Sequence, residues 1–343
     1  EADATGGDAR IDCRGACLAP GLVDIGVKVC EPGERHKESF GTAGQAAAAG
    51  GVTTMVTRPD TTPDIDTPEV LEFVARRARE ASLVRVLPMA ALTKGRAGRE
   101  MTEIGFLLDA GAVAFTDCDR VVTDTKVFSR ALTYARSLGA LVIAHVQEPT
   151  LSHGACATSG KFAALRGLPA VSPMAERMGF DRDMALVEMT GARYHVAHVS
   201  SMGAVRLIRE AKSRGIRVSA EVTPHHLALT DTDVIGYDTY CKCNPPLRSA
   251  EDRAALREAL ADGTIDCIAT DHAPHTDLEK DCEFEAASVG VNGLETAVPM
   301  LMGLVTSGEL SPLRFAEAMS TAPARLLPDE ESGTLKEGAR ADI

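Results

Sequence analysis

The chain has 343 residues, of which 45% are hydrophobic and 25% are charged, and these are ordinary values for a globular protein. Its net charge of −13, with no basic block to offset it, argues against a surface that binds nucleic acid or an anionic membrane. No apolar run approaches the roughly 20 residues that span a bilayer, and no signal peptide opens the chain. We therefore expect a small-molecule substrate.

Eight short β-branched or apolar runs recur at intervals of roughly 30 residues, with helical segments between them. The runs cover residues 21–29, 51–57, 84–92, 112–117, 140–146, 193–200, 217–224 and 264–271. Eight strands that are each followed by a helix predict an α/β fold, namely a (β/α)8 TIM-type barrel over residues 21–324.

Local signals mark individual helices and the two ends. Thr67 followed by Pro68 predicts a helix start, and Ser249 with Asp252 resembles a capping box. The segments 9–21 and 332–343 have the pattern of short strands with turns. We expect a small β domain formed from both chain termini, over residues 1–20 and 325–343, with part of that domain outside this sequence.

The nine cysteines are scattered along the chain and form no CxxC pair. Most lie inside apolar runs, as Cys267 does in IDCIATD, and this placement is typical of buried free thiols. Free thiols predict a cytoplasmic protein, because reducing compartments keep cysteines unpaired.

Polar side chains follow several of the expected strands, at the barrel end where catalytic groups lie. His145 ends the fifth strand, His198 the sixth and Asp271 the eighth, and Cys118 follows the fourth in FTDCD. Each alone would more often be structural. Two imidazoles, a thiol and a carboxylate at one barrel mouth suit zinc.

Two loops add candidate residues. ATDHAPH carries Asp271, His272 and His275; Asp271 suits a general base toward a metal-bound water, or holds backbone amides in a turn. KCNPPLR places Asn244 before a rigid Pro-Pro pair, which suits recognition of a polar substrate or makes a plain loop. In TPHHL, we expect one histidine to be structural.

The segments YHVAHVS, AEVTPHHL, NPPLR, ATDHAPHT and NGLET, in this order, resemble class I dihydroorotases of the amidohydrolase superfamily. The resemblance runs from about Pro20 to the end of the chain. It implies a (β/α)8 barrel with a small β domain that uses zinc. It also implies reversible closure of N-carbamoyl-aspartate to dihydroorotate in pyrimidine biosynthesis.

The resemblance also implies site residues. His145, His198 and Asp271 match zinc ligands of that family, and Asn244 and His275 match substrate contacts. Other positions depart from the family pattern. Gly26 and Lys28 stand in place of a His-x-His pair, Cys118 in place of a bridging aspartate, and Cys30 and Asp60 in place of a substrate-binding arginine and asparagine.

These matches and departures predict that one of the zinc positions of the family is retained. His145, His198 and Cys118 would hold one ion, with Asp271 as general base or as a further ligand. Carboxylate binding is weakened, since a lost arginine removes a charge-assisted bond worth roughly 1.5–3 kcal/mol. Asp60 would repel an anionic substrate, and Lys28 has a different reach from arginine.

Three functions fit the sequence. The first is a dihydroorotase-like cyclic amide hydrolase with a reduced zinc site. The second is a catalytically inactive homologue that acts as a structural partner of aspartate transcarbamoylase, favoured by the retained loop EPGERHKESF next to the lost ligands. The third is a hydrolase of another cyclic amide, of the hydantoin or allantoin type. A homo-oligomer is expected in each case.

Overall fold

The computed structural model describes residues 12–329 and 331–343. Seven of the eight expected runs form strands that pair in parallel. These strands are β1 (Leu22–Val27), β2 (Val52–Thr57), β3 (Arg85–Pro88), β4 (Leu141–Ala144), β7 (Arg193–Val196), β8 (Val218–Val222) and β9 (Cys267–Ile268). They lie in two sheets, ordered β1-β2-β3 and β4-β7-β8-β9.

The expected fourth strand, 112–117, is wrong as a regular strand. Phe115 instead makes single parallel bridges to Ala90 and to Val142, and these bridges join the two sheets. The physical reason is local competition for backbone donors. The Asp117 carboxylate accepts the Thr93 N–H at 2.9 Å and a second backbone N–H nearby, so a side chain takes the bonds that a longer ladder would use.

Contacts between the first and last strands close the barrel. The Lys28 N–H, just after β1, donates to the His272 carbonyl at 2.9 Å, beyond the end of β9. The buried Asp24 carboxylate of β1 accepts the Thr270 N–H at 2.8 Å. The predicted α/β barrel is therefore confirmed, with its fourth strand reduced to a bridge.

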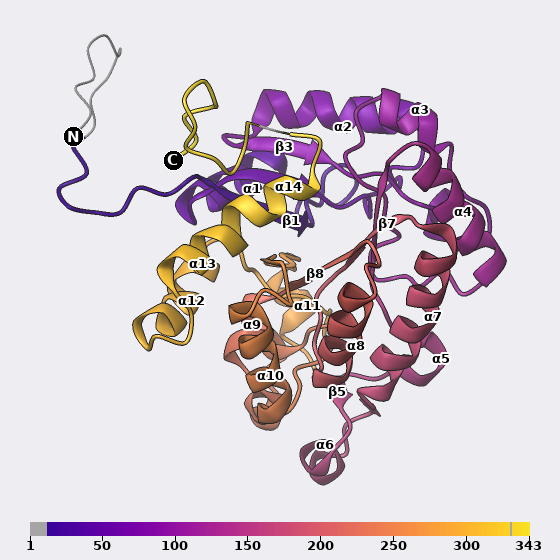
Figure 1. Ribbon diagram of the computed structural model, residues 1–343. Coiled ribbons are helices and arrows are strands. Elements are labelled where there is room, and N and C mark those ends of the chain that lie inside the picture. Colours follow the sequence, from indigo (N-terminus) through magenta and orange to yellow (C-terminus); the bar gives the residue numbers. More distant parts are fainter. Residues whose placement is uncertain (1–11, 330) are drawn as a thin grey trace.

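Helices follow one another around the outside of the strands (Figure 1). They are α1 (Phe40–Ala49), α2 (Pro68–Ala81), α3 (Ile104–Asp109), α4 (Thr125–Ser137), α7 (Met174–Thr190), α8 (Met202–Ser213), α10 (Ala250–Ala261) and α12 (Ala297–Thr306). The expected starts are confirmed. Thr67 is the N-cap of α2, and the Ser249 hydroxyl accepts the Asp252 N–H at the start of α10.

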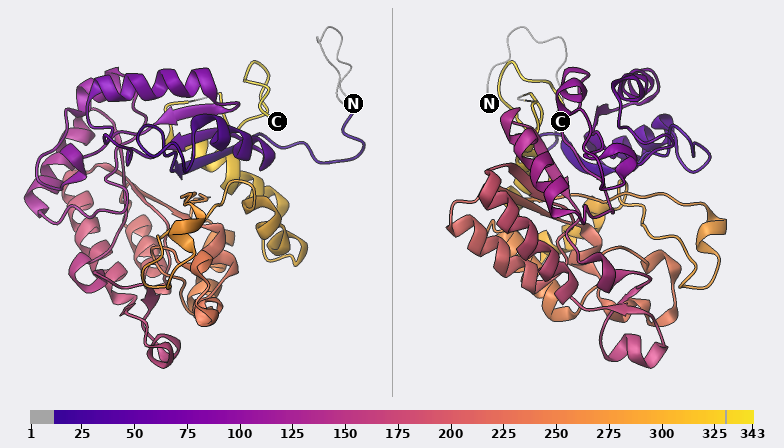
Figure 2. Two further views of the ribbon diagram at one scale, coloured as in Figure 1. Left: turned by 180° about the vertical axis from the view of Figure 1, so that it is seen from behind. Right: turned by 90° about the vertical axis from the view of Figure 1, so that its right-hand side faces the viewer.

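Shorter elements lie in the loops. One excursion carries α5 (Pro149–Ser152), β5 (Ala157–Thr158), α6 (Lys161–Arg166) and β6 (Ala170–Val171), and α6 projects from the barrel (Figures 1 and 2). The remaining elements are η1 (Lys94–Arg96), α9 (Pro224–Ala228), η2 (Asp231–Gly236), η3 (Thr239–Cys241), α11 (Asp277–Lys280), α13 (Pro312–Ala316), η4 (Glu317–Thr321) and α14 (Ala322–Leu326).

The C-terminal segment contacts the chain just before β1. The Gly21 N–H donates to the Asp342 carbonyl at 2.8 Å. Within the described residues 12–20 and 331–343 no strand forms, and residues 1–11 and 330 lie outside the described part. The small β domain therefore stays a prediction. Over the described residues, no helix has the length and apolar character needed to cross a bilayer.

Candidate active site

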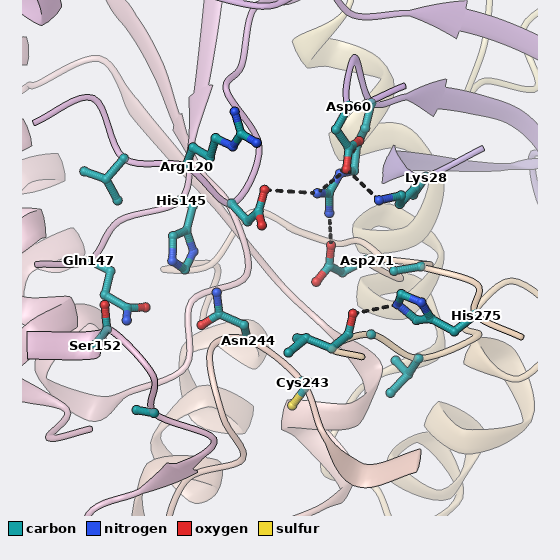
Figure 3. A pocket seen from close by; sticks show the side chains of 18 of the residues that line it. Lys28, Asp60, Arg120, His145, Gln147, Ser152, Cys243, Asn244, Asp271 and His275 are labelled. Carbon is teal, nitrogen blue, oxygen red and sulfur yellow. Dashed lines mark hydrogen bonds and ion pairs between the residues drawn. The ribbon is translucent and has the colours of Figure 1, made fainter. Parts of the chain in front are cut away.

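A cavity of about 430 Å³ opens at the barrel end where the strands finish (Figure 3). We call it the mouth pocket. Its lining includes Lys28, Arg58, Asp60, Asp119, Arg120, His145, Asn244, Asp271 and His275. Lys28, Asp60 and Asp271 lie on one side of it, and His145 lies across from them (Figure 3). The barrel thus gathers residues that are far apart in the sequence.

Three of the predicted site residues have left-handed backbone conformations. Cys118, His198 and Asp271 have φ values of 57°, 39° and 49°. Each lies within three residues of the end of a strand or of the bridged Phe115. Such conformations cost about 1–3 kcal/mol for residues other than glycine and gather at functional sites, where surrounding structure enforces them. The three side chains also line one small cavity of about 30 Å³, which shares Arg58 and Asp271 with the mouth pocket.

His145 and His198 form a close pair of neutral imidazoles. Both are buried, and their ring centroids lie 4.8 Å apart. Burial lowers the pKa of His145 to about 4 and that of His198 well below its usual range. The buried Nδ1 atoms of both rings have no hydrogen-bond partner among the described residues. Neutral imidazole is the form that binds a metal, so this pair is chemically suited to one.

Cys118 is less well placed as the third ligand. Burial raises the pKa of its thiol well above the ordinary value, which disfavours the thiolate that binds zinc. Among the described residues, two groups bring three ligand atoms within 4.8 Å of one another, and the predicted trio is neither of them. These groups are His225, His226 and Cys243, and His195, Glu221 and Cys267.

One histidine in each of those groups already has partners at both ring nitrogens, whereas the buried Nε2 atom of His225 has none among the described residues. The ring nitrogens of His226 contact the Thr223 hydroxyl and the Pro245 carbonyl, at 2.7 and 3.1 Å. The ring nitrogens of His195 contact Ser219 and Glu221, at 2.8 and 3.0 Å. A ring with both nitrogens engaged has no lone pair free for a metal.

Asp271 has an unexpected neighbour, Arg58, which follows β2 directly. The Arg58 NH1 group donates to the Asp271 Oδ1 atom at 3.1 Å. Nε and NH2 of the same guanidinium donate to the two carboxylate oxygens of Asp60, at 3.1 and 3.0 Å. Burial raises the pKa of Asp271 to about 7, although Arg58 opposes this shift.

Two of the expected departures from the family pattern, Lys28 and Asp60, contact each other. Lys28 Nζ lies 3.1 Å from the Asp60 Oδ2 atom, so Lys28 pairs with Asp60. Burial would raise the pKa of Asp60, but Arg58 and Lys28 outweigh it and hold the pKa at about 2. Asp60 does face the pocket, with its charge compensated. Cys30 is buried, and burial raises the pKa of its thiol to about 11.

The remaining predicted residues divide between pocket and scaffold. Asn244 and His275 line the mouth pocket. The His275 Nε2–H donates to the Val289 carbonyl at 2.8 Å. His272 is structural, since its Nδ1 accepts the Gly293 N–H at 3.1 Å and its Nε2 then carries the proton toward Glu38, 3.0 Å away.

The two halves of the predicted metal site therefore differ in fit. Around Asp271, Gly26 and Lys28 supply no imidazole, and a guanidinium contacts the carboxylate, so the residues do not fit a metal there. At His145 and His198, two neutral imidazoles lie close together, and their buried Nδ1 atoms have no hydrogen-bond partner among the described residues, so this pair fits a metal ion.

Arg58 and Arg120 were not identified from the sequence. Arg58 follows a predicted strand directly, so the strand-end rule that selected His145 would have found it. Arg120 lines the mouth pocket and donates to the carbonyls of Gly95 and Arg96, at 3.2 and 3.5 Å. Nothing in its local sequence distinguishes it from a surface arginine.

Comparison with known proteins agrees with this architecture. Residues 15–204 match the family model described as dihydro-orotase-like. A dihydroorotase of Anaeromyxobacter dehalogenans (strain 2CP-1) is 49% identical, over 98% of this chain and 78% of that protein. A dihydroorotase of Pelotomaculum thermopropionicum is 47% identical, over 99% and 79%.

Solved structures show the same fold. An L-hydantoinase (dihydropyrimidinase) of Arthrobacter aurescens superposes with a TM-score of 0.84 at 28% identity, covering 94% of this chain and 74% of that one. A D-hydantoinase of Thermus sp. gives 0.78 at 27% identity, with the same coverage. The chain belongs to the dihydro-orotase-like family of metal-dependent cyclic amide hydrolases.

Proposed function

We propose that the mouth pocket binds and hydrolyses a cyclic amide, with dihydroorotate and N-carbamoyl-aspartate as the substrate pair. The observation that carries this proposal is the convergence of Asp271, His145, Asn244 and His275 on one cavity of about 430 Å³. The relatives at 44–49% identity bear the name dihydroorotase, whereas the two hydantoinase structures named above are at 27–28%. This difference favours dihydroorotate over a hydantoin or allantoin.

Three pocket residues receive roles in this proposal. Asp271 takes a proton from the attacking water and returns it to the leaving nitrogen. Asn244, before its proline pair, orients the ring by hydrogen bonds. Arg120 is the guanidinium whose described bonds go to backbone carbonyls, so it is the side chain suited to a substrate carboxylate.

We propose that one zinc ion per chain binds beside His145 and His198. His145 and His198 would hold it, with Cys118 as third ligand once the metal favours the thiolate. A bound zinc would polarise the amide carbonyl as a Lewis acid. Elemental analysis of wild type and Cys118→Ala tests the ligand assignment: loss of zinc supports it, and unchanged zinc excludes Cys118.

The test of the function is turnover of dihydroorotate and N-carbamoyl-aspartate by purified protein supplied with zinc. We expect turnover in wild type and its loss in Asp271→Asn. Hydantoin and allantoin serve as comparison substrates, and preferential turnover of either would replace dihydroorotate as the substrate. No turnover of any cyclic amide would overturn the hydrolase proposal.

A second candidate is a non-catalytic partner of aspartate transcarbamoylase. The Arg58 ion pairs favour it, because they hold the carboxylate that would act as base. Co-purification of a transcarbamoylase with a protein that lacks turnover would support this candidate. The cytoplasmic location and a homo-oligomeric state also remain proposals, tested by fractionation and by light scattering.

A further inference from the structure

We propose that the Arg58 guanidinium is the resident cation of the mouth pocket and takes the place of a metal ion beside Asp271. Arg58 is well enclosed, with 13% of its side chain exposed. It contacts Asp271 through NH1 and holds both oxygens of Asp60 through Nε and NH2. A third carboxylate, Asp119, lies 3.8 Å from NH2. One side chain thus supplies a fixed positive charge to three acids.

The surroundings of Arg58 match a replaced metal rather than an ordinary ion pair. The small cavity of about 30 Å³ is lined by Arg58, Asp271, Gly26, Cys118 and His198. At Gly26, an added Cβ atom would meet nothing within 4 Å, so the position beside this residue is open, and Ile25 is the side chain of β1 that lines the cavity. The charged groups that bound this cavity are the Arg58 guanidinium, Asp271 and the buried Glu221.

A guanidinium also keeps its positive charge permanently, so it can replace the charge of a metal ion. A metal ion can displace a proton from a histidine, a cysteine or a lysine, but arginine keeps its charge in proteins. A divalent ion that bonded Asp271 would therefore lie close to a permanent positive charge, in a buried setting where repulsion is poorly screened. Metal binding through Asp271 is opposed for as long as Arg58 keeps its bidentate contact with Asp60.

This inference concerns the Asp271 side alone and is independent of the proposed function. Zinc held by His145 and His198 would be compatible with it, provided that the ion does not use Asp271. The absence of zinc from the whole chain would remove the proposed zinc site and leave this inference standing. The two ideas can therefore fail separately.

The experiment compares zinc content after equilibrium dialysis of the full chain against zinc, by elemental analysis. We expect wild type and Asp271→Asn to hold the same amount of zinc per chain, whether that amount is one or none. Zinc that is present in wild type and lost in Asp271→Asn would overturn the inference. This comparison does not depend on the folding of any Arg58 variant.

A second measurement tests the ion pairs. Arg58→Met should lower the thermal unfolding midpoint by several degrees, and by less in an Asp60→Asn background, where one buried anion is already neutral. Arg120→Met is the matched control, because Arg120 lines the same pocket but bonds backbone carbonyls. Equal, small effects of Arg58→Met and Arg120→Met would contradict a role for Arg58 as the resident cation.

Discussion

Replacement of Asp60 by asparagine should destabilise the protein in a pH-dependent way. Asp60 is 5% exposed and pairs with both Arg58 and Lys28. The pKa of Asp60 is about 2, against an ordinary value of 3.8. That difference of nearly two pH units corresponds to about 2.5 kcal/mol of stability near neutral pH. Asparagine is the residue that the dihydroorotase resemblance implies here, so its shape should be accommodated.

The sign follows from the depressed pKa. The carboxylate contributes its full stability above pH 3.8, and the contribution is lost as the pH falls toward about 2. Urea unfolding of wild type and Asp60→Asn at pH 7 and at pH 3 measures this. We expect a difference of about 2.5 kcal/mol at pH 7 and about half of that at pH 3. A difference that does not change with pH would refute the ion-pair explanation.

Two other substitutions test the scaffold around the pocket. Phe115→Ala should cost about 3–5 kcal/mol in urea unfolding, because this fully buried ring packs in the main hydrophobic core. Phe106→Ala, on a side chain 65% exposed, should change stability by less than about 0.5 kcal/mol. His272→Ala should cost about 1–3 kcal/mol, because it leaves the buried Glu38 carboxylate without its ring partner. In a double-mutant cycle, His272→Ala combined with Glu38→Gln should cost less than the sum of the two single changes.

Local patterns in the sequence were sufficient for most of the barrel. Parallel strands buried on both faces need continuous apolar runs, and the runs at 51–57 and 217–224 correspond closely to β2 and β8. The helix at Pro68 was predictable because capping and the fixed φ of proline act over a few residues. The run at 112–117 failed because Asp117 bonds backbone groups 24 residues away, which no local pattern reveals.

The candidate site likewise has features that the local sequence reveals and contacts that only the fold creates. The sequence by itself placed His145, His198 and Asp271 just beyond strands and Cys118 just beyond the bridged segment, because apolar runs and the barrel rhythm are local properties. Only the tertiary structure decided their partners. Arg58 reaches Asp271 across 213 positions of the chain, and Lys28 meets Asp60 between neighbouring strands. Ion pairing depends on distance in space and on burial, and both are fixed only when the strands come together and the barrel closes.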